Sequence, residues 1–428
     1  GSHMSGSGGV IDLSSIGMVA LECSHLDTDL GSVSVGETMG GNFSQQEIKV
    51  RVLDLVRDGN TPFAVLGIYT VESHRQTGFG LIKIGVRPNT GTLQMAKKSG
   101  NASMTDGNSC YSLENAVYNV YTDAACTKQA TDAAGNKAVL TTKADGSSNA
   151  LEMQAGTYYV KEVTPSKGYK LCTKVHTVTV TSSQKATFTC EEPPGNDPGV
   201  IHITKLDADT GESVSEGAAS LEGAQFTVKY YAGDYNSLEE AEKAGVTRTW
   251  VIQTKNVSGY YMAMLNNSYK VSGDDFYYDE DGDVVLPLGC YAIQETKAPS
   301  GYSLKGKLSS TVTGNTVSTD GGIYFTKVTE NGADFNLSGG NEYKSYDKVV
   351  RGGVKIYKRD KETGDAKASA GASLEGAEFA IISKNDGKVS VDTNGNGKYE
   401  ESESYSKGQT VMTIKTNASG LASTSADA

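Results

Sequence analysis

Ile201-His202-Ile203-Thr204-Lys205, an alternating stretch ending in lysine, leads through an Asp/Gly-rich turn to Leu221-Glu222-Gly223-Ala224-Gln225-Phe226. The same order occurs twice more, at residues 93–97 with 113–118 and at residues 354–358 with 374–379. Alternation of apolar and polar residues predicts strands. Three copies in one chain predict a domain repeated in tandem.

The first two copies close with a second shared pattern. It reads Gly156-Thr157-Tyr158-Tyr159-Val160-Lys161-Glu162 in copy one and Gly289-Cys290-Tyr291-Ala292-Ile293-Gln294-Glu295 in copy two, each followed by a proline and Gly-Tyr. The third copy stops at Ala428, before this strand begins. We therefore expect a truncated third domain with an open sheet edge.

These landmarks divide the 428 residues into five segments. Residues 1–9 resemble an expression tag and linker. Residues 10–90 predict a small β domain of unknown type, with strands at 10–13, 18–23, 47–56, 63–70 and 79–86. The repeats span 91–198, 199–350 and 351–428, and the Ser237-Leu238-Glu239-Glu240 capping box with Gly245 predicts one short helix inserted in the second.

Composition excludes two classes of partner. The net charge is −12 and no basic stripe is present, so we expect no nucleic-acid binding. No apolar run is long enough to span a bilayer, so we expect no membrane contact. Fifty glycines and 23 tyrosines suit many short strands and turns.

The three motifs in fixed order resemble the B-type domains of Gram-positive collagen adhesins and the SpaA-type pilin domains. The resemblance covers residues 91–428 and rests on the strand lysine, the Leu-x-Gly-Ala-x-Phe segment and the closing Tyr…Glu…Pro…Gly-Tyr pattern. It implies an all-β fold of tandem prealbumin-like (Ig-like) sandwiches in an elongated array. It also implies a secreted, cell-wall-anchored stalk or pilus-like protein that is no enzyme and that meets host matrix or another host surface protein.

Members of this family form an amide bond between a lysine on the first strand and an Asn or Asp on the last. By resemblance Lys205 is the nucleophile, Glu295 the proton shuttle, and Asn341 the acceptor, with Asn336 as second choice. Burial disfavours the charged amine and the charged carboxylate, as this chemistry requires. Repeat one has Lys97 and Glu162 but no Asn or Asp on its last strand, and Glu191 is one methylene too long. Repeat three has Lys358 alone, so we expect a bond only in repeat two.

Six cysteines are scattered along the chain without metal-binding spacing. Cys110 with Cys126, and Cys172 with Cys190, each bracket a turn between expected strands. Disulfides or buried free thiols are both compatible with this spacing. A Cys172–Cys190 disulfide would tie down the last strand of repeat one in place of an amide bond.

One loop matches the calcium-binding pattern. From Asp392 to Glu403, oxygen-bearing side chains stand at positions one, three, five and twelve, with glycine at six. The ligand set would be Asp392, Asn394, Asn396, Lys398, Glu400 and Glu403. The alternative is a solvated Asn/Gly-rich hairpin, and residues 279–283 predict a plain acidic hairpin.

Two other functions remain open from the sequence. Residues 10–90 or the insertion in repeat two could be the binding head of an adhesin tip, with Tyr230, Tyr231 and Tyr235 as exposed aromatics. Cys23 could serve an enzyme together with His25, or an internal thioester together with Gln45 or Gln46. The partners that either chemistry needs are missing from the surrounding sequence.

Overall fold

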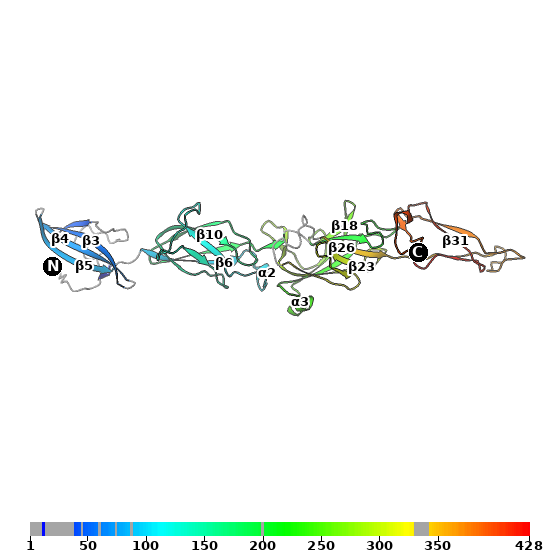
Figure 1. Ribbon diagram of the computed structural model, residues 1–428, viewed down its shortest axis with the longest axis horizontal. Coiled ribbons are helices and arrows are strands. Elements are labelled where there is room, and N and C mark those ends of the chain that lie inside the picture. Colours follow the sequence, from blue (N-terminus) through cyan, green and yellow to red (C-terminus); the bar gives the residue numbers. More distant parts are fainter. Residues whose placement is uncertain are drawn as a thin grey trace. The chain divides into compact units, whose positions relative to one another are not determined.

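The computed structural model describes residues 11–12, 38–43, 46–58, 61–72, 75–85, 89–197, 201–328 and 342–428 (Figure 1). Before residue 86 one sheet has the strand order β1-β5-β4-β3-β2. Its strands are β1 (Ile11–Asp12), β2 (Thr38–Phe43), β3 (Gln46–Asp58), β4 (Thr61–Glu72) and β5 (Arg75–Gly85). The strands expected at 47–56, 63–70 and 79–86 agree with β3, β4 and β5, and the one expected at 18–23 lies outside the described residues.

Repeat one is a sandwich of two sheets, ordered β11-β10-β7-β8 and β12-β6-β9. Its strands are β6 (Thr90–Ser99), β7 (Val117–Tyr121), β8 (Val139–Thr141), β9 (Leu151–Gln154), β10 (Gly156–Thr164), β11 (Val175–Val180) and β12 (Lys185–Glu192). Inward residues of both sheets, such as Leu93, Tyr118 and Val160, form one apolar core. Burial of every second residue is the alternation that the sequence displays.

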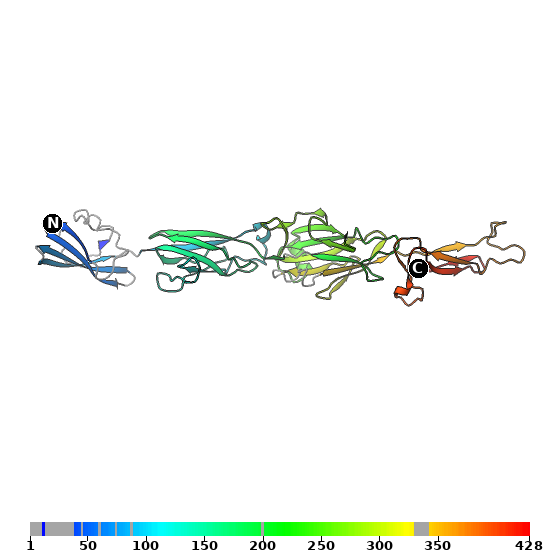
Figure 2. The same ribbon diagram turned by 90° about the horizontal axis from the view of Figure 1, so that it is seen from above.

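Repeat two has the same design with larger sheets, seen as two layers in Figure 2. The first sheet is β17 (Lys255–Val257), β18 (Tyr260–Met264), β14 (His202–Asp207), β26 (Glu342–Val349), β23 (Tyr302–Ser310) and β24 (Thr316–Ser318). The second is β19 (Lys270–Gly273), β16 (Arg248–Gln253), β15 (Gln225–Tyr231), β22 (Gly289–Lys297) and β25 (Tyr324–Val328). A small third sheet joins β13 (Asn196–Asp197), β21 (Val284–Pro287) and β20 (Tyr277–Tyr278).

Part of repeat one belongs to the core of repeat two. Residues 99–113, with the short helix α2 (Ala102–Thr105), group with the residues from 191 onward as one compact unit. Met104 and Tyr111 join the buried cluster of repeat two. The Tyr111 hydroxyl donates to Gly195 O (2.7 Å) and accepts from Leu288 N (2.8 Å). This segment therefore packs as part of the second repeat.

The predicted insertion helix is present as α3 (Leu238–Ala244). Ser237 Oγ accepts the N–H of Glu240 (3.2 Å), and Gly245 ends the helix with a positive φ of 101°. The Glu240 carboxylate accepts from Asn236 N instead of Ser237 N, so only half of the capping box forms. With α2 and a 3-10 turn at Glu401–Glu403, these are the helices of the described residues, and none is long and apolar enough to cross a membrane.

Repeat three forms three two-stranded ladders among residues 342–428. They are β27 (Lys355–Tyr357) with β32 (Leu421–Ser423), β28 (Glu378–Ile382) with β31 (Thr410–Lys415), and β29 (Val389–Ser390) with β30 (Ser404–Tyr405). In repeat two the corresponding first strands, β14 and β15, each have two neighbours. Tyr357 and Ile382 are 58% and 51% exposed, which leaves apolar surface uncovered.

Candidate functional site

Lys205 lies at the centre of the repeat-two sandwich. It sits on β14, between β18 and the parallel strand β26, directly opposite Ser345 in the register. Its side chain is fully buried, as are Ile203 two residues before it and Ile293 on the facing sheet. A lysine is almost never fully buried unless a partner compensates its charge.

Two carboxylates meet this amine. Asp347 Oδ2 is 2.9 Å from Lys205 Nζ, and Glu295 Oε1 is 3.2 Å from it, with all three side chains fully buried. Glu295 comes from β22 in the facing sheet and Asp347 from β26 beside β14. Neither Asp347 oxygen has a hydrogen-bond partner among the described residues, so Lys205 is left to compensate the buried charge.

The electrostatics favour a protonated Glu295. Burial raises the pKa of this carboxyl to about 8; Lys205 opposes the rise, and the charge of the nearby Asp347 adds to it. At neutral pH Glu295 is thus mainly a neutral acid beside the Lys205 amine and the Asp347 carboxyl group. Lysine, a carboxyl acceptor and a carboxylic acid in contact can form an amide.

Asp347 is the site residue that the sequence reasoning missed. The predicted acceptors, Asn341 and Asn336, lie outside the described residues, whereas Lys205 and Glu295 are brought together as expected. The available signal was the alternation Tyr343-x-Ser345-x-Asp347, in which every second residue of β26 is buried. The parallel register places the carboxyl group that contacts Lys205 two residues beyond Ser345, the residue opposite the lysine.

Repeat one holds the matching lysine and glutamate as a buried ion pair. Lys97 Nζ is 2.9 Å from Glu162 Oε1, and both side chains are fully buried. Glu162 Oε2 also accepts the Cys172 N–H (2.8 Å). A backbone donor of this kind favours an ionised carboxylate, in contrast to Glu295.

The acceptor position of repeat one is occupied by glutamate. Three residues after each lysine a backbone N–H donates to the last strand, from Gly100 to Glu192 O and from Ala208 to Asp347 O. Glu192 therefore stands where Asp347 stands, and it is fully buried while Glu191, the residue we considered, is exposed. In repeat three Lys358 is exposed.

At the described cysteines the structure shows no disulfide, which agrees with the free-thiol alternative that the sequence left open. None of the five described cysteines is in a disulfide, and Cys110, Cys126, Cys172 and Cys290 are free thiols. Cys190 Sγ instead lies 3.1 Å from His176 Nε2. Spacing alone could not show that an imidazole on β11 takes the place of the second sulfur. Cys23, His25 and Gln45 lie outside the described residues, and of Gln46 only the backbone is described.

The predicted calcium loop is closed on itself by hydrogen bonds. Asp392 accepts from the N–H groups of Gly395, Asn396 and Gly397, while Glu403 Oε1 accepts from Thr393 N and Asn394 N. Asn394 and Asn396 each donate an amide to Glu400. No group of three His, Cys, Asp or Glu side chains suited to a metal occurs among the described residues, so a cation here would need asparagine and carbonyl oxygens as well.

The aromatic residues proposed for a binding head are mostly core. Tyr230 and Tyr231 are fully buried. Tyr230 stacks on Trp250 (6.3 Å between centroids) and donates to Leu288 O (2.9 Å). Tyr230 continues the alternation of Phe226 and Val228 into the core of the sandwich, whereas Tyr231 is buried in a separate cluster with Ala241 of α3 and Cys290.

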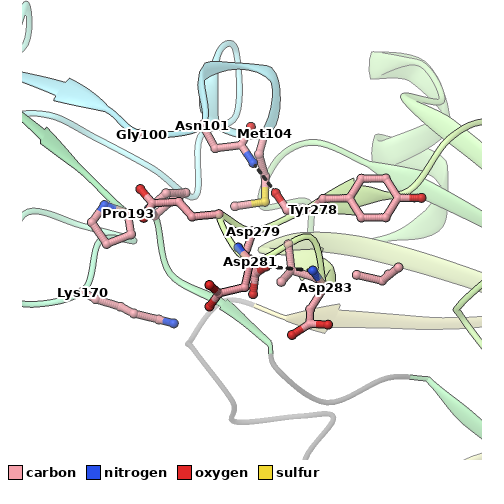
Figure 3. A pocket seen from close by; sticks show the side chains of 13 residues that line it. Gly100, Asn101, Met104, Lys170, Pro193, Tyr278, Asp279, Asp281 and Asp283 are labelled. Atoms are coloured by element: carbon pink, nitrogen blue, oxygen red, sulfur yellow. Dashed lines mark hydrogen bonds between the residues drawn. The ribbon is translucent and has the colours of Figure 1, made fainter.

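A cavity of about 700 Å³ lies beside the acidic hairpin (Figure 3). Residues 279–283 form the predicted turn, with Gly282 N donating to Asp279 O (3.2 Å) and Asp283 N to Asp279 Oδ1 (2.9 Å). Asn101 and Met104 form the other wall, and Lys170 lies at its edge. Among these lining residues there is no paired nucleophile and base, so the cavity carries no catalytic arrangement.

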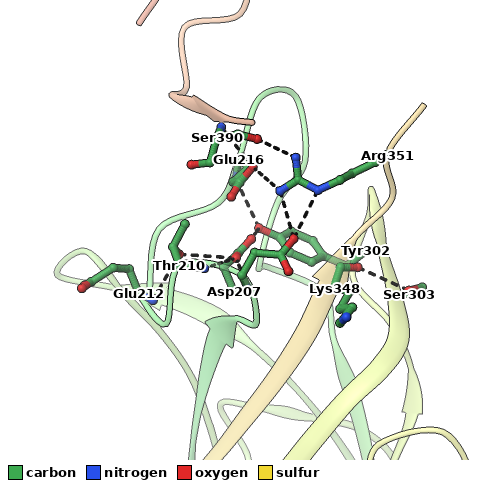
Figure 4. A network of polar contacts seen from close by, with 10 residues as sticks. Asp207, Thr210, Glu212, Glu216, Tyr302, Ser303, Lys348, Arg351 and Ser390 are labelled. Carbon is green, nitrogen blue, oxygen red and sulfur yellow. Dashed lines mark hydrogen bonds and ion pairs between the residues drawn. The ribbon is translucent and has the colours of Figure 1, made fainter. Parts of the chain in front are cut away.

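A second buried ionic cluster joins repeats two and three (Figure 4). The Arg351 guanidinium is 2.9 Å from Asp209 Oδ2 and 3.3 Å from Glu216 Oε2, and it donates to Ser390 O (2.5 Å). Glu216 Oε2 also accepts Ser390 N (3.3 Å). Burial raises the pKa of Glu216 to about 7, with Asp207 acting in the same direction and Arg351 against it.

Comparison with known proteins identifies the family. Residues 99–193 and 199–331, more than half of the chain, match the family described as SpaA, prealbumin-like fold domain. No curated protein sequence matches. Among solved structures, the Bacillus anthracis TIE protein is 19% identical with a TM-score of 0.46, over 92% of this chain and 54% of that one. This chain thus spans about half the length of the TIE protein.

Two pilins are also similar in structure. A streptococcal ancillary pilin is 15% identical (TM-score 0.25, 72% of this chain and 76% of that one). BcpA, the major pilin subunit of Bacillus cereus, is 11% identical (TM-score 0.25, 78% and 84%). The prealbumin-like sandwiches and the extent of the family match lead to one conclusion: the chain belongs to the SpaA prealbumin-like domain family.

Proposed function

We propose that this protein is a surface stalk or adhesin of a Gram-positive bacterium whose second repeat is locked by an amide bond between Lys205 and Asp347. The observation that carries the proposal is the buried triad of one amine and two carboxylates, with contacts of 2.9 and 3.2 Å. Such a cluster is costly as separate charges, because each ion has lost its hydration. Formation of the amide would remove the charges of Lys205 and Asp347, and with them the cost of burying this pair.

The reaction balances without an external reagent. Lys205 Nζ transfers one proton to an oxygen of the Asp347 carboxyl group and attacks its carbon, forming the C–N bond, and the C–O bond to that oxygen then breaks. Protonated Glu295 supplies a proton to the departing oxygen, and the second proton lost by nitrogen restores Glu295. The products are one amide and one water. Folding already holds the groups in contact in a dry core, so the reaction does not bear the entropy cost of bringing them together. In well-oriented reactions this lowers the barrier by roughly 7–11 kcal/mol.

The proposed bond gives the domain a mechanical role. It would join β14, near the start of repeat two, to β26 at its end. Tension applied to the two ends would then pass through the amide, and residues 206–346 would not extend. This suits a secreted, wall-anchored protein displayed toward host matrix or another host surface protein, with a single intramolecular reaction in place of turnover.

Intact mass tests the proposal. We expect the reduced chain to lack the mass of one water, and peptide mapping to find the Lys205 and Asp347 peptides joined. Lys205→Ala, Glu295→Ala and Asp347→Ala should each restore full mass. Asp347→Asn would lose ammonia instead of water, and its product would be identical to the wild-type product. A wild-type chain at full mass would contradict the bond and leave the fold standing.

We also propose calcium for the loop from Asp392 to Glu403. The carboxylates at the first and twelfth positions, Asp392 and Glu403, each accept hydrogen bonds from backbone N–H groups of the loop. The loop is therefore already folded around two of the groups that would bind the cation. Hydrogen bonds lower the pKa of Glu403 to about 2, which keeps it ionised. Asp392, Asn394, Asn396 and Glu403 would offer side-chain oxygens, Lys398 its carbonyl, and Glu400 a further carboxylate.

A further inference from the structure

Ser345 lies inside the triad without belonging to it. It is fully buried on β26, opposite Lys205 in the register. Its hydroxyl donates to Glu295 Oε2 at 2.6 Å and accepts from Lys205 Nζ at 3.1 Å. A hydroxyl has one donor and two acceptor sites, so Ser345 contacts both groups at once.

These contacts distinguish the two oxygens of Glu295. Oε2 accepts from Ser345 (2.6 Å) and from Lys205 (3.3 Å), so it is the unprotonated oxygen of a neutral acid. Oε1 is buried without a hydrogen-bond partner among the described residues. Oε1 lies 3.2 Å from Lys205 Nζ but makes no hydrogen bond with it, so the acid proton is assigned to Oε1.

We propose that Ser345 is a positioning residue for the cross-link: its hydroxyl fixes Glu295 Oε2 as an acceptor and leaves Oε1 to carry the proton toward the Asp347 carboxyl. This inference rests on the proposed amide bond. Ser345 gains and loses no atoms in the reaction. In repeat one the equivalent position, two residues before Glu192, is Cys190, whose sulfur contacts His176.

The rate of bond formation on refolding provides the test. Unreacted chain, isolated in denaturant, is diluted into buffer at several pH values and quenched at intervals, and the loss of one water is followed by intact mass. Trp250, the only tryptophan, is fully buried in repeat two, so its fluorescence reports folding separately from the chemistry. Ser213→Ala is the matched control, because this buried hydroxyl bonds only the backbone of Lys205 and Tyr261.

We expect Ser345→Ala to fold with normal Trp250 kinetics but to lose water at least about tenfold more slowly. The Ser345 hydrogen bond holds down the pKa of Glu295, so its loss should also move the alkaline fall in rate to higher pH. Ser345→Thr keeps the hydroxyl and should restore the rate and the pH profile. A purely structural residue would not shift that profile.

Other outcomes separate the two proposals. If Ser345→Ala matches wild type and Ser213→Ala in rate and pH profile, the role of Ser345 is wrong and the bond stands. If wild type itself keeps full mass, the bond is wrong and this inference falls with it. Should Ser345→Ala not fold, Ser345→Cys, which keeps the volume but donates weakly, takes its place under the same expectations.

Discussion

Single residues distinguish the buried lysine that we propose to be cross-linked from the one that is held in an ion pair. In repeat two Lys205 faces Asp347 and Glu295, whose pKa is raised by burial, while in repeat one Glu162 accepts a hydrogen bond from Cys172 N. The equivalent acceptor in repeat one is glutamate, whose extra methylene places its carboxyl carbon differently. Two domains with the same strands thus have different chemistry because of two or three side chains.

The ion pair of repeat one should be structural. Lys97→Ala leaves the fully buried Glu162 carboxylate without its 2.9 Å cation, and we expect it to cost about 3–5 kcal/mol. The double change Lys97→Met with Glu162→Gln should cost less, since it leaves Glu192 as the one buried carboxyl group that has lost this cation. Denaturant unfolding followed by far-UV circular dichroism measures both. The Trp250 transition, which reports repeat two, should not move. Equal losses for the single and double variants would contradict this account.

At the scale of elements, the parallel pair of β14 and β26 makes the cross-link possible. Parallel neighbours place residues of the first and last strands side by side in register, here Lys205 with Ser345 and Asp207 with Asp347. β22 brings Glu295 over them from the other layer. The repeats differ in the loops between their strands, and the Asp392–Glu403 loop of repeat three is one of these.

Calcium removal tests that loop. We expect saturating Ca²⁺ to stabilise repeat three by roughly 1–3 kcal/mol over chelated protein, because a ligand that binds only the folded state shifts the unfolding equilibrium. Thermal unfolding with and without chelator measures the difference, and Asp392→Ala should abolish it. Asp279→Ala, in the acidic hairpin, is the control and should keep the effect. Identical melting curves with and without Ca²⁺ would show a plain hairpin.

At the scale of the molecule, buried contacts tie neighbouring repeats together. Residues 99–113 supply Met104 and Tyr111 to the core of repeat two. On the other side Arg351 bridges Asp209, Glu216 and Ser390 of repeats two and three, and lies 4.3 Å from the centre of the Tyr399 ring. Tyr302 donates to Asp207 Oδ2 (2.8 Å) beneath it. Two acids, Asp209 and Glu216, thus pair with one guanidinium.

The stability of this joint should depend on pH through Glu216. Its pKa is about 7 in the folded protein against an ordinary 4.5, so protonation favours the folded state. The contribution is full below pH 4.5 and is lost as pH rises through 7, an effect on the order of 2 kcal/mol. Thermal unfolding of wild type and Glu216→Gln from pH 4 to 8 measures it. Wild type should lose stability relative to the variant across this range, and parallel curves would refute the role of Glu216.

The sequence by itself determined the repeats, the strands, the inserted helix and two members of the triad. Local patterns carry these features: period-two alternation marks strands, Ser237 and Gly245 bound a helix, and a lysine or glutamate at a fixed place in a repeated motif is visible without coordinates. Local patterns of this kind could not predict whether the cysteines form disulfides or whether the tyrosines near the insertion are buried.

Only the tertiary structure decided which groups touch. Asp347, Ser345 and Glu192 were found through the register of a strand pair that joins residues about 140 apart, and a register is set by packing across the whole sandwich. The same packing placed His176 against Cys190, turned Tyr230 and Tyr231 inward, and brought Arg351 to Glu216. The sequence identifies the reactive side chains, whereas the tertiary structure determines the distances between them.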